Sequence, residues 1–147
     1  MRYGNQESVV ESFLPTLTPR VKESGPQVPL IDLLRRGLPM AEFEALQGLL
    51  DLPEDSLAPM LGISRATLHR RKKSGRLETP ESERVVRFAR LFGRAVELFE
   101  SPEAAREWLK SPARGCGGET PLSYSDTEYG AREVEDLMGR IEHGVFS

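Results

Sequence analysis

Residues 52–76 read LPEDSLAPMLGISRATLHRRKKSGR, and this stretch decides the fold. Pro53 followed by two acids is typical of the first turn of a helix, because proline lacks an N–H that would stay unpaired there and acids complement the positive helix end. Gly62 marks the end of that helix, and Ser64 is a suitable N-cap for the next. Ile63 between them is expected to enter the core. The stretch therefore predicts a helix, a short glycine turn and a basic helix.

The residues before this stretch divide into two predicted parts. Apolar positions within 30–38 and 40–50 recur at three and four residues, which predicts two short amphipathic helices separated near Pro39. Residues 1–29 are rich in proline and show no sustained helical or strand period. We therefore expect 1–29 to be a flexible N-terminal arm.

A long core helix is predicted after the basic helix. Thr79 followed by Pro80 is typical of a cap and a first helical residue, and apolar side chains from Val85 to Phe99 recur at three, four and seven residues. A loop is expected at 111–118. The same start signals predict further helices after Ser101-Pro102, Thr120-Pro121 and Thr127. We expect an all-α protein with one part at 30–78 and a second at 79–147.

Charge is divided unequally along the chain, whose formal net charge is −3. Residues 64–76 contain bases and no acid, whereas acids outnumber bases in 119–147. The negative total argues against a protein coated in positive charge for non-specific nucleic-acid binding. The asymmetry indicates two surfaces with different partners.

The basic helix suits the major groove of DNA, which admits a helix whose first residues reach base edges. Arg65 is the candidate for guanine, because its guanidinium can bond two acceptors at once, and the later bases are expected to hold phosphates. The alternative is an ordinary solvated helix face. The candidate DNA-binding residues are Ser64, Arg65, Thr67, Leu68, His69, Arg70, Arg71, Lys72 and Lys73.

The sequence lacks the residues that several classes of function require. One cysteine and two histidines give neither an internal disulfide nor a zinc cluster, so no metal or cofactor is expected, and Cys116 is interpreted as inert rather than reactive. Glu133, Asp136 and Glu142 have no predicted partner base, so we expect no enzyme activity. No run approaches the roughly 18 apolar residues of a membrane span. With no apolar run near Met1 that resembles a signal peptide, the chain is expected to be cytoplasmic.

The last residues form a candidate insertion segment. Gly144 gives flexibility before the apolar pair Val145 and Phe146, and the preceding helix is acidic. Such a segment fits into a cleft on a partner, and its charge complements a basic cleft. The alternative is that Val145 and Phe146 pack back onto their own core.

Four stretches carry a resemblance to a known family. They are LGISRATLHRR at 61–71, ESER at 81–84, AAREWL at 104–109 and, most specific, DTEYGAREVEDLMGRIEHGVFS at 126–147. From about Leu30 onward the chain resembles the antitoxins of the Xre/MbcA/ParS group, which pair with RES-domain toxins. It departs from them at 111–118, where many relatives have a shorter asparagine-proline turn.

The resemblance implies an antitoxin of a type II toxin-antitoxin system. Such an antitoxin, usually a dimer, represses its operon through the helix-turn-helix half and binds the toxin through the C-terminal half. RES toxins are described as degrading NAD, and the end of the antitoxin blocks the NAD cleft. Carried onto this chain, the resemblance implies toxin binding by Glu128, Arg132, Glu135, Asp136, Arg140, Ile141, Glu142, His143, Gly144, Val145, Phe146 and Ser147.

Two other functions stay open at this point. An ordinary helix-turn-helix regulator with a C-terminal dimerisation domain fits the basic helix equally well, and a toxin gene next to this one would decide against it. A small enzyme using the C-terminal acids requires a pocket that the sequence does not show. A homodimer is expected, because one recognition helix buries little surface, whereas a two-fold pair reads half-sites about 34 Å apart.

Overall fold

The computed structural model describes residues 29–144, and every extended regular element in that range is a helix. The predicted all-α class is confirmed. An isolated β-bridge joins Pro39 to Arg76. The predicted arm at 1–29 lies, apart from Pro29, outside the described residues, and so do Val145, Phe146 and Ser147.

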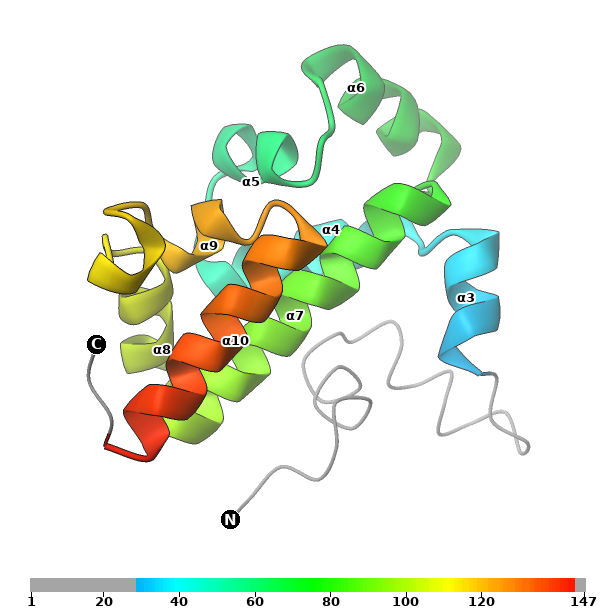
Figure 1. Cartoon of the computed structure of the whole chain (residues 1–147). Coiled ribbons are helices and arrows are strands. Elements are labelled where there is room, and N and C mark those ends of the chain that lie inside the picture. Colours follow the sequence, from blue (N-terminus) through cyan, green and yellow to red (C-terminus); the bar gives the residue numbers. More distant parts are fainter. Residues whose placement is uncertain (1–28, 145–147) are drawn as a thin grey trace.

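Figure 1 shows the helices, which follow the chain as α3 (Leu30–Arg36), α4 (Met40–Leu50), α5 (Glu54–Met60), α6 (Arg65–Ser74), α7 (Thr79–Phe99), α8 (Pro102–Leu109), the 3-10 helix η1 (Arg114–Cys116), α9 (Pro121–Tyr124) and α10 (Glu128–Glu142).

The long helix α7 is the centre of the fold. Its apolar face, including Phe88 and Phe92, is buried, as the predicted spacing requires. The helices α3, α4, α8 and α10 all pack against α7, and Figure 1 shows α10 running beside it in the same direction. Trp108 of α8 lies against Phe99, with ring centroids 5.5 Å apart. One apolar core therefore extends from the basic-helix end of the molecule to α10.

Three of the predicted helix starts are confirmed by their caps. In each, a side-chain oxygen accepts a hydrogen bond from the backbone N–H three residues later, which satisfies a donor that the first turn leaves unpaired. The capping residues are Ser101, Thr120 and Thr127.

The predicted cap of α7 is wrong by one residue. Glu78, not Thr79, is the N-cap, and its N–H donates to the Glu81 carboxylate over 2.9 Å. The Thr79 hydroxyl instead donates to the Leu34 carbonyl over 2.8 Å, which ties α7 to the end of α3. The carboxylate three residues inside the helix satisfies the cap, so the threonine is free for this long-range bond.

The predicted loop at 111–118 contains the short helix η1. Its last residue, Cys116, is buried, and burial together with the nearby Glu119 carboxylate raises the pKa of the thiol. A buried thiol with a raised pKa carries little of the reactive thiolate. Its burial supports the interpretation of Cys116 as inert.

Candidate functional site

The predicted turn between α5 and α6 is confirmed. Gly62 has a φ of 73°, and a Cβ there would lie 2.8 Å from the Arg84 guanidinium, which donates to the Leu61 carbonyl over 3.1 Å. Ser64 caps α6, its hydroxyl oxygen accepting the Thr67 N–H over 3.1 Å. The turn needs both the glycine conformation and the cap, so the start of the basic helix has a fixed position on the fold.

The basic helix α6 is held by ion pairs as well as by apolar contact. Leu68 is the buried residue of this fully described helix. Arg71 donates two hydrogen bonds to Glu81, at 2.8 and 3.0 Å, and forms an ion pair with Glu78 at 3.3 Å. Lys72 forms a more exposed pair with Glu54 of α5. Paired carboxylates thus anchor the helix at two points.

The Arg71–Glu81 pair shifts the pKa of both partners. Burial alone would raise the pKa of Glu81, but hydrogen bonds from Arg71 and the Glu78 N–H, with the charges of Arg71 and Arg84, hold it below its ordinary value. The hydrogen bond to Glu81 raises the pKa of Arg71 against its own burial. Both side chains therefore stay charged at neutral pH.

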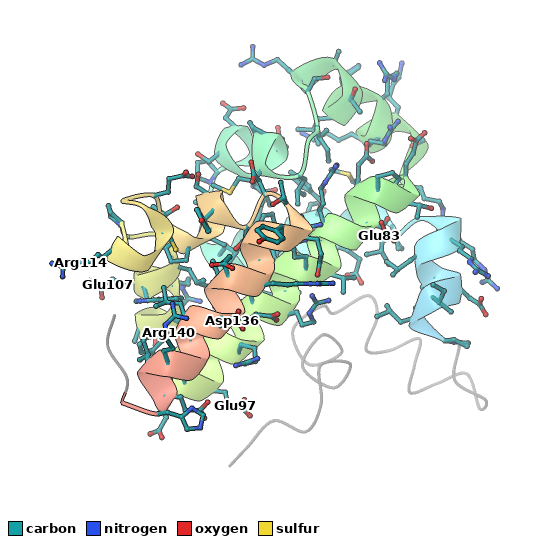
Figure 2. All side chains as sticks on the ribbon, in the orientation of Figure 1. Glu83, Glu97, Glu107, Arg114, Asp136 and Arg140 are labelled. Carbon is teal, nitrogen blue, oxygen red and sulfur yellow. The ribbon has the colours of Figure 1, made fainter. Side chains whose placement is uncertain are left out.

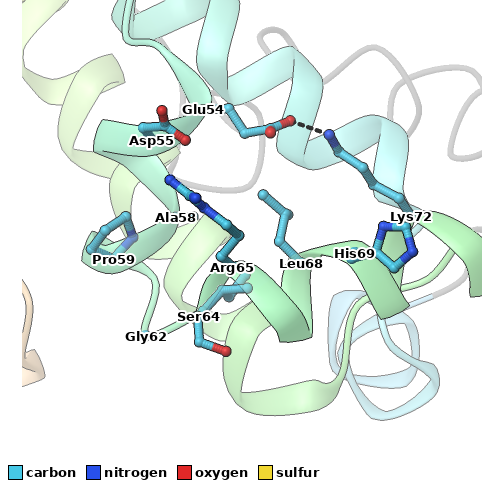
Figure 3. Close-up of a pocket in the computed structure, with 11 residues that line it drawn as sticks. Glu54, Asp55, Ala58, Pro59, Gly62, Ser64, Arg65, Leu68, His69 and Lys72 are labelled. Carbon is cyan, nitrogen blue, oxygen red and sulfur yellow. Dashed lines mark ion pairs between the residues drawn. The ribbon is translucent and has the colours of Figure 1, made fainter.

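A hollow of about 630 Å³ opens between α5 and α6 (Figure 3). Apolar Ile63 and Leu68 line it together with Glu54, Arg65 and Lys72, and the Lys72–Glu54 pair lies in it. Because carboxylates and bases share this lining, the hollow does not concentrate one sign of charge. The bases of α6 outside this lining are Arg70, Arg71 and Lys73.

The predicted DNA-binding residues divide between the hollow and the opposite side of α6. Leu68 and Arg71 face inward, Lys72 is paired, and Thr67 is half-buried. Ala66, exposed in the first turn, was missed because it carries no charge; the helical spacing from Leu68 would have placed it. The predicted residues exposed to solvent are Ser64, Arg65, His69, Arg70, Lys72 and Lys73; of these, Ser64, Arg65, His69 and Lys72 also line the hollow between α5 and α6.

The helix α10 packs closely on its neighbours. Val134 and Met138 are buried, and a Cβ at Gly130 would lie 1.8 Å from the Tyr124 carbonyl oxygen. Only glycine allows the end of α9 to approach the first turn of α10 this closely. The position of α10 is therefore set by backbone contact as well as by apolar packing.

A seam of opposite charges joins α10 to α7. Arg87 contacts Glu128 at 3.2 Å and also donates to the carbonyl of Asp126 over 3.2 Å. Arg90 lies 3.8 Å from Glu128 and 3.9 Å from Glu135. Two acids expected to bind the toxin, Glu128 and Glu135, therefore contact α7 of their own chain.

The opposite face of α10 is open to solvent. Tyr129 is 76% exposed, and Arg132, Glu133 and Asp136 are also exposed. Arg140 and Ile141 are half-buried, whereas Glu142, His143 and Gly144 are exposed at the end of the helix. Figure 2 shows Asp136 and Arg140 on successive turns of α10. Sequence reasoning missed Tyr129 and placed Glu133 only among unlikely catalytic acids, although the helical period from Val134 sets both on the outer side.

The described part of the chain shows neither a metal site nor a membrane-spanning helix. Residues 29–144 contain no group of three histidine, cysteine or acidic side chains placed to hold a metal. None of the helices in that range is long and apolar enough to cross a membrane. The two exposed faces, on α6 and on α10, are the candidate binding surfaces.

Comparison with known proteins agrees with this division. Residues 29–90 match the antitoxin Xre-like helix-turn-helix domain, and residues 94–144 match the antitoxin Xre/MbcA/ParS C-terminal toxin-binding domain. "Antitoxin Xre" of Yersinia enterocolitica is 38% identical over 120 residues, which cover 80% of this chain and 81% of the relative. The chain belongs to the Xre antitoxin family. A second "Antitoxin Xre", from Photorhabdus laumondii, is also 38% identical, over 84% of both chains.

A third, more distant relative is also similar to this Xre-family chain. The "Prs ADP-ribosylating antitoxin" of a Sphingobium species is 25% identical over 127 residues, or 80% of each chain. All three relatives carry the word antitoxin in their names. In the Xre-family chain the first domain match ends at 90 and the second begins at 94, both inside α7, so the face on α6 and the face on α10 belong to different domains that share one helix.

Proposed function

We propose that this antitoxin neutralises a RES-domain, NAD-degrading toxin by blocking its cleft and represses its own operon by binding DNA. The observation that carries the proposal is the pairing of a helix-turn-helix domain at 29–90 with a toxin-binding domain at 94–144 in one compact chain. The two exposed faces have different chemistry, basic on α6 and mixed on α10, which suits one nucleic-acid and one protein partner.

Operator binding is assigned to the exposed residues of α6. Its first turn presents Ser64, Arg65 and Ala66 to base edges, with Arg65 suited to guanine and the Ala66 methyl suited to thymine. Arg70 and Lys73 lie farther along the helix, where they would hold phosphates. A homodimer would double these contacts across two half-sites.

Toxin blocking is assigned to residues 143–147. His143 and Gly144 are exposed beyond the end of α10, and Gly144 has a φ of 75°, which lets the chain turn away from the helix axis. The acids of α10 suit a basic cleft that holds the phosphates of NAD. Blocking the cleft would need no chemistry from the antitoxin itself, which is consistent with a non-enzymatic protein of the cytoplasm.

The test is co-expression with the product of the adjacent gene, scoring growth and cellular NAD. The full chain is expected to restore growth, whereas a chain lacking residues 144–147 is expected to leave NAD depleted. The deletion removes no residue of α10, so its Tm should stay within about 2 °C of the full chain.

A loss of stability in the shortened chain would instead mean that Val145 and Phe146 pack on their own core. Growth that never depends on the antitoxin would contradict the proposal and favour an ordinary transcriptional regulator. A turnover assay on the purified chain would address the enzyme alternative.

A further inference from the structure

We propose that Glu54 is a specificity-determining residue of the DNA-binding half, because its carboxylate holds Lys72 away from DNA phosphates and so keeps the affinity for non-operator DNA low. This inference rests on the proposed function and goes beyond it, since it assigns to an acid of α5 a role against DNA contact. From the sequence, Glu54 was expected only to favour the first turn of a helix.

The Glu54–Lys72 ion pair joins the two walls of the hollow between α5 and α6 (Figure 3). The side chains of Glu54 and Lys72 remain 37% and 44% exposed, so Lys72 would be accessible to DNA phosphate without the carboxylate. Arg65 lines the same hollow and lies seven residues before Lys72, which puts the two bases on one side of α6. A DNA backbone that meets Arg65 would therefore run close to Lys72.

The fold gains little from this ion pair. Exposed pairs between long side chains contribute weakly to stability, because solvent screens the charges and the side chains lose freedom. The helix α6 is already anchored by buried Leu68 and by the less exposed Arg71–Glu81 pair. Asp55, in the same first turn of α5, also complements the positive helix end. The pairing of an acid with a base of the DNA-binding helix is therefore better explained by DNA binding than by stability.

The ion pair reduces the number of bases that α6 offers to phosphate. Arg71 and Lys72 are both paired with acids. Within residues 29–144 no ion pair involves the other bases of the helix, which are Arg65, Arg70 and Lys73. Non-specific affinity for DNA comes almost entirely from phosphate contacts and grows with the number of cations that displace counterions. A carboxylate that occupies one cation, and that itself repels phosphate, therefore lowers this affinity.

Operator binding depends less on Lys72 than non-specific binding does. Base contacts from the first turn of α6, where Ser64 and Arg65 lie, fix the helix in one register and add affinity that other DNA does not gain. Specificity is the difference between the two affinities, so a group that weakens mainly the phosphate contribution raises specificity. Glu54 thereby improves discrimination between the operator and other DNA without touching a base.

The experiment measures fluorescence anisotropy of the full-length chain with two labelled duplexes at several salt concentrations. One duplex is the DNA upstream of the chain's own gene, and the other has the same composition in shuffled order. Glu54→Gln keeps the size of the side chain and removes its charge. Affinity for the shuffled duplex is expected to rise about fivefold, with the slope of log affinity against log salt steeper by about 1, while affinity for the upstream duplex rises less than about twofold.

Lys72→Ala separates release of the lysine from simple loss of a repelling charge. On its own it should leave the salt slope for the shuffled duplex unchanged, because Glu54 already occupies Lys72. Combined with Glu54→Gln, it should return the steeper slope to the value of the parent. A lysine that already contacts phosphate in the parent would instead reduce the slope by about 1 when removed, and that result would overturn the inference.

Glu107→Gln is the matched control for net charge. Glu107 is an exposed acid on α8, within the toxin-binding domain, and Figure 2 shows it well away from α6. Its substitution changes the net charge as Glu54→Gln does, and it should leave both affinities and the salt slope unchanged. The Tm of each variant should stay within about 2 °C of the parent, as expected for exposed side chains.

The outcomes separate this inference from the proposed function. If the parent prefers its upstream DNA and Glu54→Gln leaves the affinity for shuffled DNA unchanged or lowers it, the inference is overturned and the proposed function stands. Equal gains on both duplexes would mean that Glu54 opposes DNA binding without adding specificity, and would also overturn the inference. If the parent does not prefer its upstream DNA, the operator-binding part of the proposed function fails together with the inference.

Discussion

Gly130 has no side chain, and the backbone at the end of α9 leaves no room for one. The added Cβ would meet the Tyr124 carbonyl at 1.8 Å and its carbon at 3.0 Å. Neither atom belongs to a flexible side chain, so relief requires that α9 and α10 move apart. The cap at Thr127, whose hydroxyl accepts the Gly130 N–H over 3.0 Å, would be disturbed by the same movement.

Gly130→Ala is therefore expected to lower the free energy of unfolding by about 3 kcal/mol, through overpacking and a weakened cap. Urea unfolding followed by circular dichroism measures it. Gly139→Ala is the control on the same helix and should stabilise by about 0.5–1 kcal/mol. A loss below about 1 kcal/mol at Gly130 would show that the α9–α10 contact yields more easily than the structure indicates.

Residue identity alone could predict part of this site. The positions of Ser64 and Thr127 as caps follow from local hydrogen bonding, which depends on three or four neighbouring residues. The roles of Glu128 and Glu135 could not be predicted, because their partners Arg87 and Arg90 lie on another helix. The family resemblance indicated which helix binds the toxin but not which face of that helix is exposed. Acids that hold α10 against α7 were therefore expected to face the toxin.

At the scale of elements, α6 depends on the carboxylate of a neighbouring helix. Arg71 and Glu81 are both largely buried, with side chains 14% and 10% exposed, and they form two short hydrogen bonds. Removing one charge leaves the other without its partner in a poorly solvated place. The resulting loss in the free energy of unfolding is larger than the stabilisation that an exposed pair provides. The orientation of the DNA-binding face is thus coupled to one ion pair.

Glu81→Gln is expected to destabilise the chain by about 2 kcal/mol at pH 7. Since the folded state holds the pKa of Glu81 below its ordinary value, the stabilisation is complete above about pH 4.3 and is lost as pH falls through the lowered pKa. The parent and the variant should therefore converge in stability once the pH lies below this lowered pKa, as urea unfolding over a series of falling pH values would measure.

Glu54→Gln is the matched control, because it removes the more exposed partner of Lys72. It should cost less than about 0.5 kcal/mol and show little change with pH. Equal effects of the two substitutions would contradict the assignment of Glu81 as the anchor of α6.

The helix starts could be predicted at this scale except where a distant group intervened. Periodic apolar residues and proline at the first turn were enough for α5, α7 and α8. The cap of α7 was misplaced because the acceptor for Thr79 is the Leu34 carbonyl, 45 residues earlier in the chain. No local pattern contains that contact.

For the whole molecule, two binding faces at opposite ends should be separable by substitution. Lys73→Ala is expected to weaken operator binding and reduce the slope of log affinity against log salt by about 1 per bound copy, while growth rescue from the toxin is unchanged. Fluorescence anisotropy with upstream DNA at several salt concentrations measures it.

Arg114→Ala provides the control for charge alone, since Arg114 is exposed on η1, well away from α6 in Figure 2. It should leave the salt slope unchanged. The same slope in the parent and in both variants would show that α6 does not contact phosphate.

The α7 helix leads to a constraint on how such proteins can be recombined. The match to one domain ends at 90 and the match to the other begins at 94, within a continuous helix of 21 residues. One residue inserted between them would rotate everything after it by roughly 100° and advance it by about 1.5 Å. Chimeras that join the helix-turn-helix half of one relative to the toxin-binding half of another must therefore keep the helical register of this junction.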